Sequence, residues 1–239
     1  MKAIDPDLLL RAYSIGVFPM ADSRAADDVY WVEPKKRGIM PLDGFRLSHS
    51  LAKTIRSERF TVTADKAFSQ VVSECAASTS DRPDTWINPA IEIAYADLHR
   101  RGHAHSIETW HDGRLVGGLY GVKLGGAFFG ESMFSRESNA SKVALAYLVA
   151  RLRAGKFTLL DCQFITDHLQ SLGAIEVSRD AYVALLDSAM GVAGGAVGAA
   201  AGWSPPDFFA LDGATDPERR TVSGPISGCT IVQLLGHTS

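Results

Sequence analysis

The spacing of apolar residues along the chain predicts helices that alternate with short strands. Between residues 68 and 75, apolar side chains recur at i, i+3, i+4 and i+7, the spacing of one buried helix face. Asp5-Pro6 and Asn88-Pro89 are typical helix starts, because Asp and Asn cap free N–H groups and proline fits the first turn. Other expected caps are Ser48, Asp65, Asp167 and Ser178. Helices are therefore expected at residues 5–16, 48–56, 65–75, 88–102, 139–153, 167–173 and 178–190.

Apolar runs and alternating segments between these helices predict strands. Asp112-Gly113 is a two-residue hairpin signal, and Gly125-Gly126 marks a second turn, so the strands on either side form an antiparallel meander. Strands are expected at residues 30–32, 38–41, 60–63, 104–110, 114–120, 127–129, 157–163 and 175–177. This order of elements indicates an α+β fold with one mixed sheet and helices packed on it.

The same pattern divides the chain into three parts. Residues 1–59 are expected to form a small α/β subdomain, and residues 60–190 a larger α+β domain. Residues 191–202 contain only Gly, Ala and Val, and this glycine density disfavours a helix, so they are interpreted as a linker. The linker and the tail that follows it, residues 191–239, have no assigned role.

The strand expected at residues 157–163 (FTLLDCQ) carries two polar side chains among apolar ones. Side chains alternate between faces in a strand, so Asp161 and Gln163 share one face while Leu160 and Cys162 share the other. A buried carboxylate and carboxamide cost free energy unless something uses them. Two interpretations remain open here, a functional site or a hydrogen-bonded core pair. Glu131 is a similar lone carboxylate among apolar residues at a strand end.

Composition is that of an ordinary globular protein, with 46% hydrophobic and 21% charged residues and a net charge of −3. A protein that binds nucleic acid through charge alone is normally basic, so any RNA contact must come from a local patch. Residues 31–59 hold seven Lys or Arg and three Asp or Glu, a net charge of +4. The alternative is a solvated surface with a modest excess of charge. The candidate contacts to an RNA backbone are Lys35, Lys36, Arg37, Arg46, Lys53 and Arg56.

Several chemistries lack their usual sequence signals. The three cysteines lie far apart, which disfavours a disulfide framework or a CxxC metal site. His103, His105 and His111 are close in sequence, but no Asp, Glu or Cys completes a ligand spacing, so no metal is expected. P-loop and G-x-S-x-G motifs are absent. No apolar run reaches 18 residues and no signal peptide is found, so a cytoplasmic protein without a membrane span is expected.

Six sequence blocks, in order, resemble the leucyl/phenylalanyl-tRNA–protein transferase family. They are WINPAIEIAY (86–95), GHAHSIETW (102–110), LVGGLYGV (115–122), FFGESMFS (128–135), NASK (139–142), and LDCQ (160–163) with SLGA (171–174). The resemblance runs from about residue 8 to residue 190 and implies a GNAT-type acyltransferase domain preceded by a smaller domain. It implies transfer of Leu, Phe or less often Met from aminoacyl-tRNA to proteins that begin with Arg or Lys, which marks them for N-end-rule degradation. No cofactor is implied.

The resemblance also assigns roles to individual residues. Asp161 would orient Gln163, which would contact the attacking amine, and Glu131 and Asp161 would supply negative charge for the cationic acceptor. Trp86 matches a position that stacks on the terminal adenine of the tRNA, and Tyr95 and Trp31 are further substrate-binding positions. After the Phe-Pro pair some members have Trp, where this chain has Met20. The positions expected to form the apolar pocket for the Leu or Phe side chain are Leu119, Phe128, Met133, Leu145, Leu148 and Leu160.

Two other functions are weighed against this one. A GNAT-fold acyl-CoA-dependent N-acyltransferase needs a Gly-rich pyrophosphate loop before its helix, and residues 135–138 read SRES instead. A non-enzymatic RNA-binding module would leave Asp161, Gln163 and Glu131 without a purpose.

Overall fold

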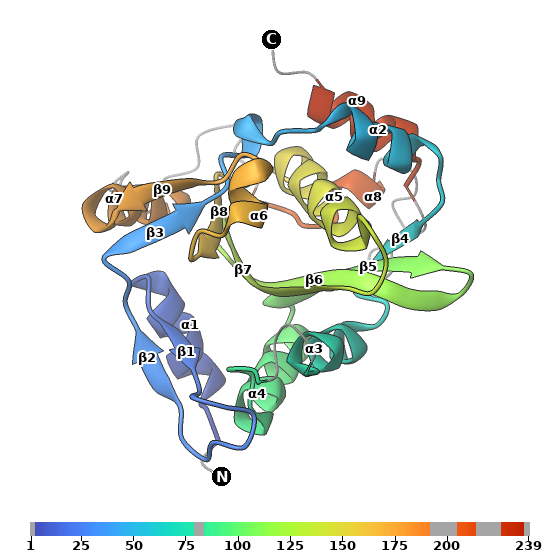
Figure 1. Cartoon of the computed structure of the whole chain (residues 1–239). Helices are drawn as coiled ribbons and strands as arrows, with labels where there is room; N and C mark the ends of the chain where they lie inside the picture. The colour runs from blue at the N-terminus through green and yellow to red at the C-terminus, as the bar shows by residue number, and fades with distance from the viewer. Residues whose placement is uncertain (1–2, 79–83, 192–204, 214–225, 237–239) are drawn as a thin grey trace.

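The computed structural model describes residues 3–78, 84–191, 205–213 and 226–236, and a seven-stranded sheet forms its centre (Figure 1). The sheet order is β4-β5-β6-β7-β8-β3-β9, and all neighbouring strands are antiparallel except the parallel pair β7–β8. A separate two-stranded ribbon pairs β1 (Phe18–Met20) with β2 (Tyr30–Val32). The strands of the large sheet are β3 (Lys36–Ile39), β4 (Thr61–Ala64), β5 (Ala104–His111), β6 (Arg114–Leu124), β7 (Ala127–Ser135), β8 (Leu159–Gln163) and β9 (Ile175–Ser178).

Helix α5 (Ala140–Ala154) dominates one face of the sheet (Figure 1). Twelve of its fifteen residues are buried, as its mostly apolar sequence predicts. Around it lie α2 (His49–Arg56), α8 (Ala210–Gly213), α9 (Gly228–Gly236) and the 3₁₀ turn η1 (Leu42–Gly44). Within the described ranges, no helix combines the length and the apolar character needed to cross a membrane.

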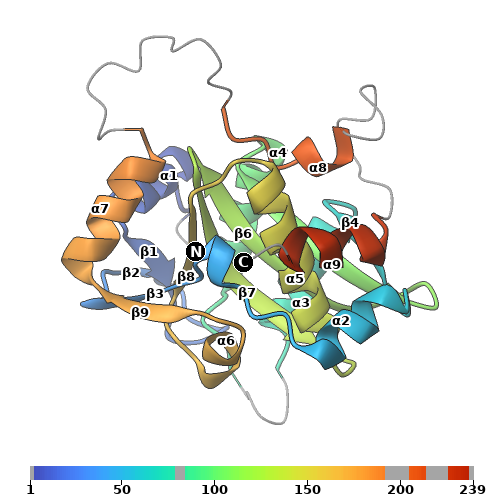
Figure 2. The same cartoon turned by 90° about the horizontal axis from the view of Figure 1, so that it is seen from above.

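The opposite face carries α1 (Pro6–Ser14), α3 (Phe68–Ala76) and α4 (Pro89–Arg100) (Figure 1). Two further helices, α6 (Asp167–Ser171) and α7 (Arg179–Ala189), flank β9. Seen from above, α7 lies at one end of the molecule and α2, α8 and α9 at the other, with α5 over the sheet between them (Figure 2). Two apolar cores result, one on each face of the sheet.

Most of the expected helix caps are confirmed, and two are wrong. The side chains of Asp5, Ser48, Asn88 and Ser178 accept hydrogen bonds from the first turns of α1, α2, α4 and α7. Asp65 does not cap α3, because its carboxylate instead accepts the backbone N–H of Ser106, at 2.8 Å. Likewise Thr166, and not Asp167, caps α6.

The expected boundary after residue 59 cuts through the larger body. Strand β3 lies inside the seven-stranded sheet, between β8 and β9, and α2 packs against α5. The β1–β2 ribbon lies outside the large sheet, while α1 packs against both β1 and β6. The pairing of β3 with β8 and β9 joins segments more than 100 residues apart and leaves no local signal in the sequence.

The described part of the tail folds back onto α5. Phe208 is fully buried, and Arg151 of α5 forms a buried two-bond ion pair with Asp212 at 2.5 and 2.8 Å. Helix α9 packs against both α5 and α2. Most of the predicted linker, residues 191–202, lies outside the described residues.

The parallel pair β7–β8 separates partway along its length, and this separation creates the space for a site. The two strands pair from Ala127 with Leu159 to Phe129 with Asp161, and pairing then stops although both strands continue. On the other side of β7, the register with β6 shifts between Tyr120 and Gly121, so that Glu131 is an extra, bulged residue. Bulges of this kind re-aim side chains and are frequent beside active sites.

Candidate functional site

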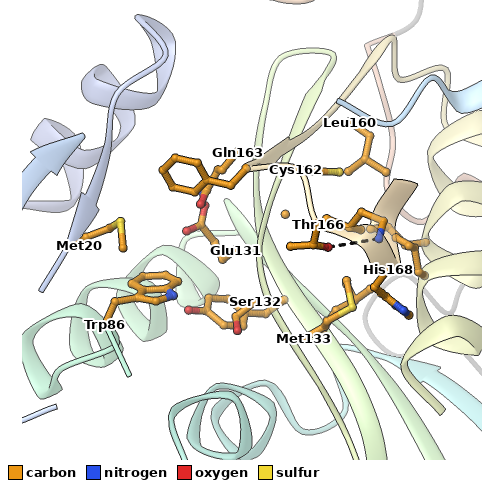
Figure 3. Close-up of a pocket in the computed structure, with 17 residues that line it drawn as sticks. Met20, Trp86, Glu131, Ser132, Met133, Leu160, Cys162, Gln163, Thr166 and His168 are labelled. Atoms are coloured by element: carbon orange, nitrogen blue, oxygen red, sulfur yellow. Dashed lines mark hydrogen bonds between the residues drawn. The ribbon is translucent and has the colours of Figure 1, made fainter. Parts of the chain in front are cut away.

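A cavity of about 300 Å³ lies where β7 and β8 separate, between these strands, α5 and α6 (Figure 3). Its wall is mainly apolar, with a polar end formed by Glu131 and Gln163. Five of the six residues expected to form the apolar pocket line it: Leu119, Met133, Leu145, Leu148 and Leu160. These five residues come from four different elements, β6, β7, α5 and β8.

Phe128, the sixth expected pocket residue, does not line the cavity. It lies where β7 still pairs with β8, before the strands separate, and it is fully buried. Its ring instead stacks near Phe208 of the tail, with 5.7 Å between ring centroids. It is a core residue in this structure.

Trp86 and Met20 lie together on one side of the cavity (Figure 3). The backbone N–H of Ala21 donates to the carbonyl of Trp86 at 3.2 Å, which holds the end of β1 beside the start of α4. Trp31 lies outside this group, because it is on β2, 41% exposed, and does not line the cavity. Met20 and Trp86 are thus the two large side chains that β1 and the α4 start bring to the cavity.

Glu131 is held at the polar end by three donors from three elements. The hydroxyl of Tyr13 lies 2.6 Å from Oε1 and that of Tyr95 2.8 Å from Oε2, while Nε2 of Gln163 donates to Oε1 at 2.9 Å. Tyr95 is fully buried and does not line the cavity; its hydroxyl supports Glu131 from behind the cavity wall. Burial raises the pKa of Glu131 to about 7, against the opposing effect of its three donors.

Asp161 is fully buried and forms an ion pair with Arg37. The guanidinium donates from Nε to Oδ1 at 2.9 Å and from Nη2 to Oδ2 at 2.6 Å, and the Tyr182 hydroxyl donates to Oδ2 at 2.8 Å. The rings of Phe18 and Tyr182 lie 4.7 and 4.6 Å from the Arg37 guanidinium carbon. Because its charge is neutralised and enclosed here, Asp161 does not offer negative charge to a ligand in the cavity.

The expected group of cations for contact with RNA is also corrected. Arg37 is 1% exposed and belongs to the core, so it is not available to an RNA backbone. The other five cations are exposed but fall into two groups: Lys35 and Lys36 at the start of β3, and Arg46, Lys53 and Arg56 on and before α2. Strand β3 and helix α2, beside which these two groups lie, are on different parts of the molecule (Figures 1 and 2).

Gln163 ends β8 with a left-handed backbone, φ 60°, which is uncommon for a residue with a side chain. Oδ1 of Asp161 accepts the backbone N–H of Gln163 at 2.7 Å and so holds this turn. The carboxamide then lies in the cavity wall against Glu131 (Figure 3). Asp161 thus positions Gln163 through its backbone, while the carboxamide contacts Glu131.

Several site residues were missed in the sequence. Tyr13 and Tyr182 lie on buried helix faces, where a phenol needs a polar partner, and this requirement was the available signal. Strand alternation predicts a core position for Cys162, yet Cys162 lines the cavity. Burial raises the pKa of its thiol well above the usual range. His168 also lines the cavity, and its Nε2 is buried without a hydrogen-bond partner among the described residues.

The three neighbouring histidines do not converge on one site. Nδ1 of His105 lies 2.7 Å from Oδ2 of Asp65, and the His105 ring stacks on Phe208. Nδ1 of His111 lies 2.9 Å from Oε2 of Glu137. In the described ranges, no group of three or more His, Cys, Asp or Glu side chains is arranged to hold a metal ion.

Comparison with known proteins adds an independent finding. Residues 39–187 match the family model described as leucyl/phenylalanyl-tRNA protein transferase, and residues 2–35 match the model of that family's N-terminal domain. A protein of Rhizorhabdus wittichii named leucyl/phenylalanyl-tRNA–protein transferase is 85% identical, with 100% of each chain aligned. A protein of the same name from Zymomonas mobilis is 69% identical over 78% of this chain and 70% of its own.

Among solved structures, the fold is similar to that of FemX, with a TM-score of 0.50 and 13% sequence identity. The match covers 72% of this chain and 66% of FemX. With the mixed sheet and its packed helices, this likeness confirms the expected GNAT-type acyltransferase fold.

Proposed function

Because the chain belongs to the leucyl/phenylalanyl-tRNA–protein transferase family, it is an aminoacyltransferase, and we propose that it moves Leu, Phe and less often Met onto proteins beginning with Arg or Lys. The acceptor would be the α-amine of that first residue. The modified proteins would enter N-end-rule degradation, and the cytoplasm, where aminoacyl-tRNA is used, is the proposed compartment.

One observation supports this proposal above the others: the cavity joins an apolar wall to a polar end. A Leu or Phe side chain fits the wall made by Leu119, Leu145 and Leu148, and flexible Met133 adapts to both shapes. The ester carbonyl would then lie toward Gln163 and Glu131. The terminal adenine would stack on Trp86, with the thioether of Met20 beside it.

The main task of the protein in this reaction is to position the acceptor amine against the aminoacyl ester. An aminoacyl ester is already activated, and an unperturbed α-amine has a pKa of about 7.7–8.0, so a useful fraction is neutral. A carboxamide is a very weak base, so Gln163 is proposed to position the amine and not to take its proton. Asp161 keeps Gln163 in place through the 2.7 Å bond to its backbone N–H.

Contacts to the tRNA backbone are proposed for Arg46, Lys53 and Arg56, which are exposed on and before α2. Lys35 and Lys36 form a second exposed group, although Lys36 already pairs with Glu176 at 2.7 Å. Binding of this kind depends on salt and does not depend on sequence.

A transfer assay tests the proposal directly. Phenylalanyl-tRNA with labelled Phe is mixed with the protein and a peptide beginning with Arg, in parallel with the same peptide acetylated at its N-terminus. Label on the free-amine peptide alone is expected, because the nucleophile is the α-amine. Absence of label from both peptides, with acetyl-CoA consumed instead, would contradict the proposal and favour an acyl-CoA-dependent enzyme.

A further inference from the structure

Glu131, Tyr13 and Tyr95 form a closed triangle of oxygen atoms. Tyr13 lies 2.6 Å from Oε1 of Glu131, Tyr95 lies 2.8 Å from Oε2, and the two tyrosine hydroxyl oxygens are 2.5 Å apart. The three residues come from β7, α1 and α4. Glu131 reaches this position as the bulged residue of β7, and it also lines the cavity.

The number of protons in this triangle differs between the neutral and the ionised form of Glu131. Three oxygen–oxygen contacts need three protons, and the two tyrosine hydroxyls provide two. The third proton must lie on Glu131, whose neutral carboxyl then donates to one tyrosine and completes the ring. In the ionised form, both hydroxyls and Gln163 donate to the carboxylate, and only the contact between the tyrosines lacks a proton. The neutral carboxyl therefore completes the triangle, while the ionised carboxylate keeps three donors and loses only the hydrogen bond between the two tyrosines.

The surrounding charges favour neither form strongly. Asp161 on β8 raises the pKa of Glu131 by repulsion, but the guanidinium of Arg37 on β3 neutralises that carboxylate. Tyr120 on β6 packs against Tyr95, with 5.3 Å between ring centroids, and Tyr182 on α7 bonds to Asp161. Burial raises the pKa of Glu131 to about 7, close to physiological pH, where a general acid or base works best.

We propose that Glu131, supported by Tyr13 and Tyr95, carries the proton between the attacking amine and the departing tRNA oxygen. The nitrogen lone pair forms the C–N bond, and the electrons of the ester C–O bond go to the tRNA oxygen. The nitrogen gives one proton to ionised Glu131, and the neutral carboxyl passes this proton to the oxygen, so Glu131 ends ionised as it began. This step rests on the proposed function and gives the proton role to Glu131, leaving Gln163 to position the amine.

The first measurement determines the pKa of Glu131 in the protein without substrate. Protein labelled with ¹³C at the glutamate carboxyl is titrated by NMR, and Glu131→Gln identifies the signal by its loss. We expect this signal to titrate near neutral pH. Tyr95→Phe should move it to higher pH, because that substitution removes a donor to the carboxylate. Tyr147→Phe removes a buried hydroxyl that bonds to the carbonyl of Ile226, away from the site, and should leave the signal unchanged.

The second measurement follows single-turnover transfer to an Arg-peptide as a function of pH. The acceptor amine titrates identically with every variant, so differences between variants belong to the enzyme. We expect Tyr95→Phe to shift the acid limb of the rate profile in step with the NMR titration. Glu131→Gln should abolish that enzyme-dependent limb and lower the rate by about 10²-fold or more.

The outcomes separate the inference from the function on which it rests. The proton role is overturned if the carboxyl of Glu131 is ionised over the whole pH range. It is also overturned if Tyr95→Phe shifts the NMR titration but leaves the pH dependence of the transfer rate unchanged. Either result leaves the proposed transferase function standing. Absence of transfer by the unmodified protein at every pH overturns the proposed function and the proton role together, whatever the NMR titration shows.

Discussion

The guanidinium of Arg37 and the carboxylate of Asp161 form a buried ion pair across 124 residues of sequence, with donor distances of 2.6 and 2.9 Å. The pair joins β3 to β8 at the point where the cavity opens, and Asp161 in turn holds the backbone of Gln163. A core ion pair therefore fixes the strand end that carries the candidate site. A change at this position is therefore expected to affect both the stability of the fold and the placement of Gln163.

Removal of Arg37 is expected to destabilise the fold strongly. Arg37→Ala leaves the carboxylate of Asp161 buried without its counter-charge, and breaking such a pair costs about 3–5 kcal/mol of unfolding free energy. Urea denaturation measures this loss. Lys36→Ala is the matched control, since its neighbouring ion pair with Glu176 is exposed and should leave the unfolding free energy nearly unchanged. Equal losses in the two variants would contradict a special role for the buried pair.

Trp86 is predicted to bind the terminal adenine. Loss of base–aromatic stacking costs ~1–3 kcal/mol, so Trp86→Ala should raise the KM for aminoacyl-tRNA about 5- to 150-fold with little change in kcat. Steady-state kinetics with varied aminoacyl-tRNA check this. Trp31→Ala serves as control, because Trp31 is 41% exposed on β2 and lies outside the cavity. An unchanged KM for aminoacyl-tRNA in Trp86→Ala would show that Trp86 does not bind the terminal adenine.

Local sequence signals predicted most of the helices and strands. Helix spacing, caps and hairpin turns are short-range features, and they located α1 to α7 and the meander of β5, β6 and β7. The pocket residues followed from the family blocks, and five of six line the cavity. Phe128 was the exception, because whether a strand residue faces the cavity depends on where β7 leaves β8, which is a property of pairing between distant segments.

Long-range partners explain the remaining differences. Arg37 was counted among surface cations, yet strand alternation places it on the same face as Ile39, which is a signal of burial. Its partner Asp161 could not be identified locally, and neither could the buried Arg151–Asp212 pair that fastens the tail to α5. A charge count along a segment does not separate exposed cations from those that have a buried partner.

The size of the apolar pocket should set the preference between Leu and Phe. Leu148→Ala enlarges the wall of the cavity, so transfer of Phe is expected to increase relative to transfer of Leu. A competition assay with equal amounts of leucyl-tRNA and phenylalanyl-tRNA measures the ratio of products. Phe128→Leu also shrinks a buried apolar side chain, but it lies outside the cavity and should leave this ratio unchanged. If the product ratio changes in both variants, or in neither, the cavity does not set the preference between Leu and Phe.

Glu131 is predicted to make stability fall as pH rises toward neutrality. Its pKa is about 7 in the folded protein against an ordinary value of 4.5, so between these values the folded state binds the proton that the unfolded state has released. Unfolding free energy therefore decreases with pH across this window and levels off above it. A pKa difference of this size corresponds to about 3 kcal/mol. Glu131→Gln removes the titrating group, so the stability of the variant relative to the unmodified protein should improve by about that amount from pH ~4.5 to pH ~7.

Urea denaturation of both proteins at a series of pH values measures the difference directly. The absolute stability of Glu131→Gln is not the test, because the amide also changes the hydrogen bonds with Tyr13, Tyr95 and Gln163. The pH dependence of the difference is the test. Tyr147→Phe removes a buried hydroxyl without removing a group that titrates in this window, so its difference from the unmodified protein should stay constant. A constant difference for Glu131→Gln as well would show that Glu131 ionises in the folded protein as readily as in the unfolded chain, and that its burial beside two tyrosines does not hold the proton.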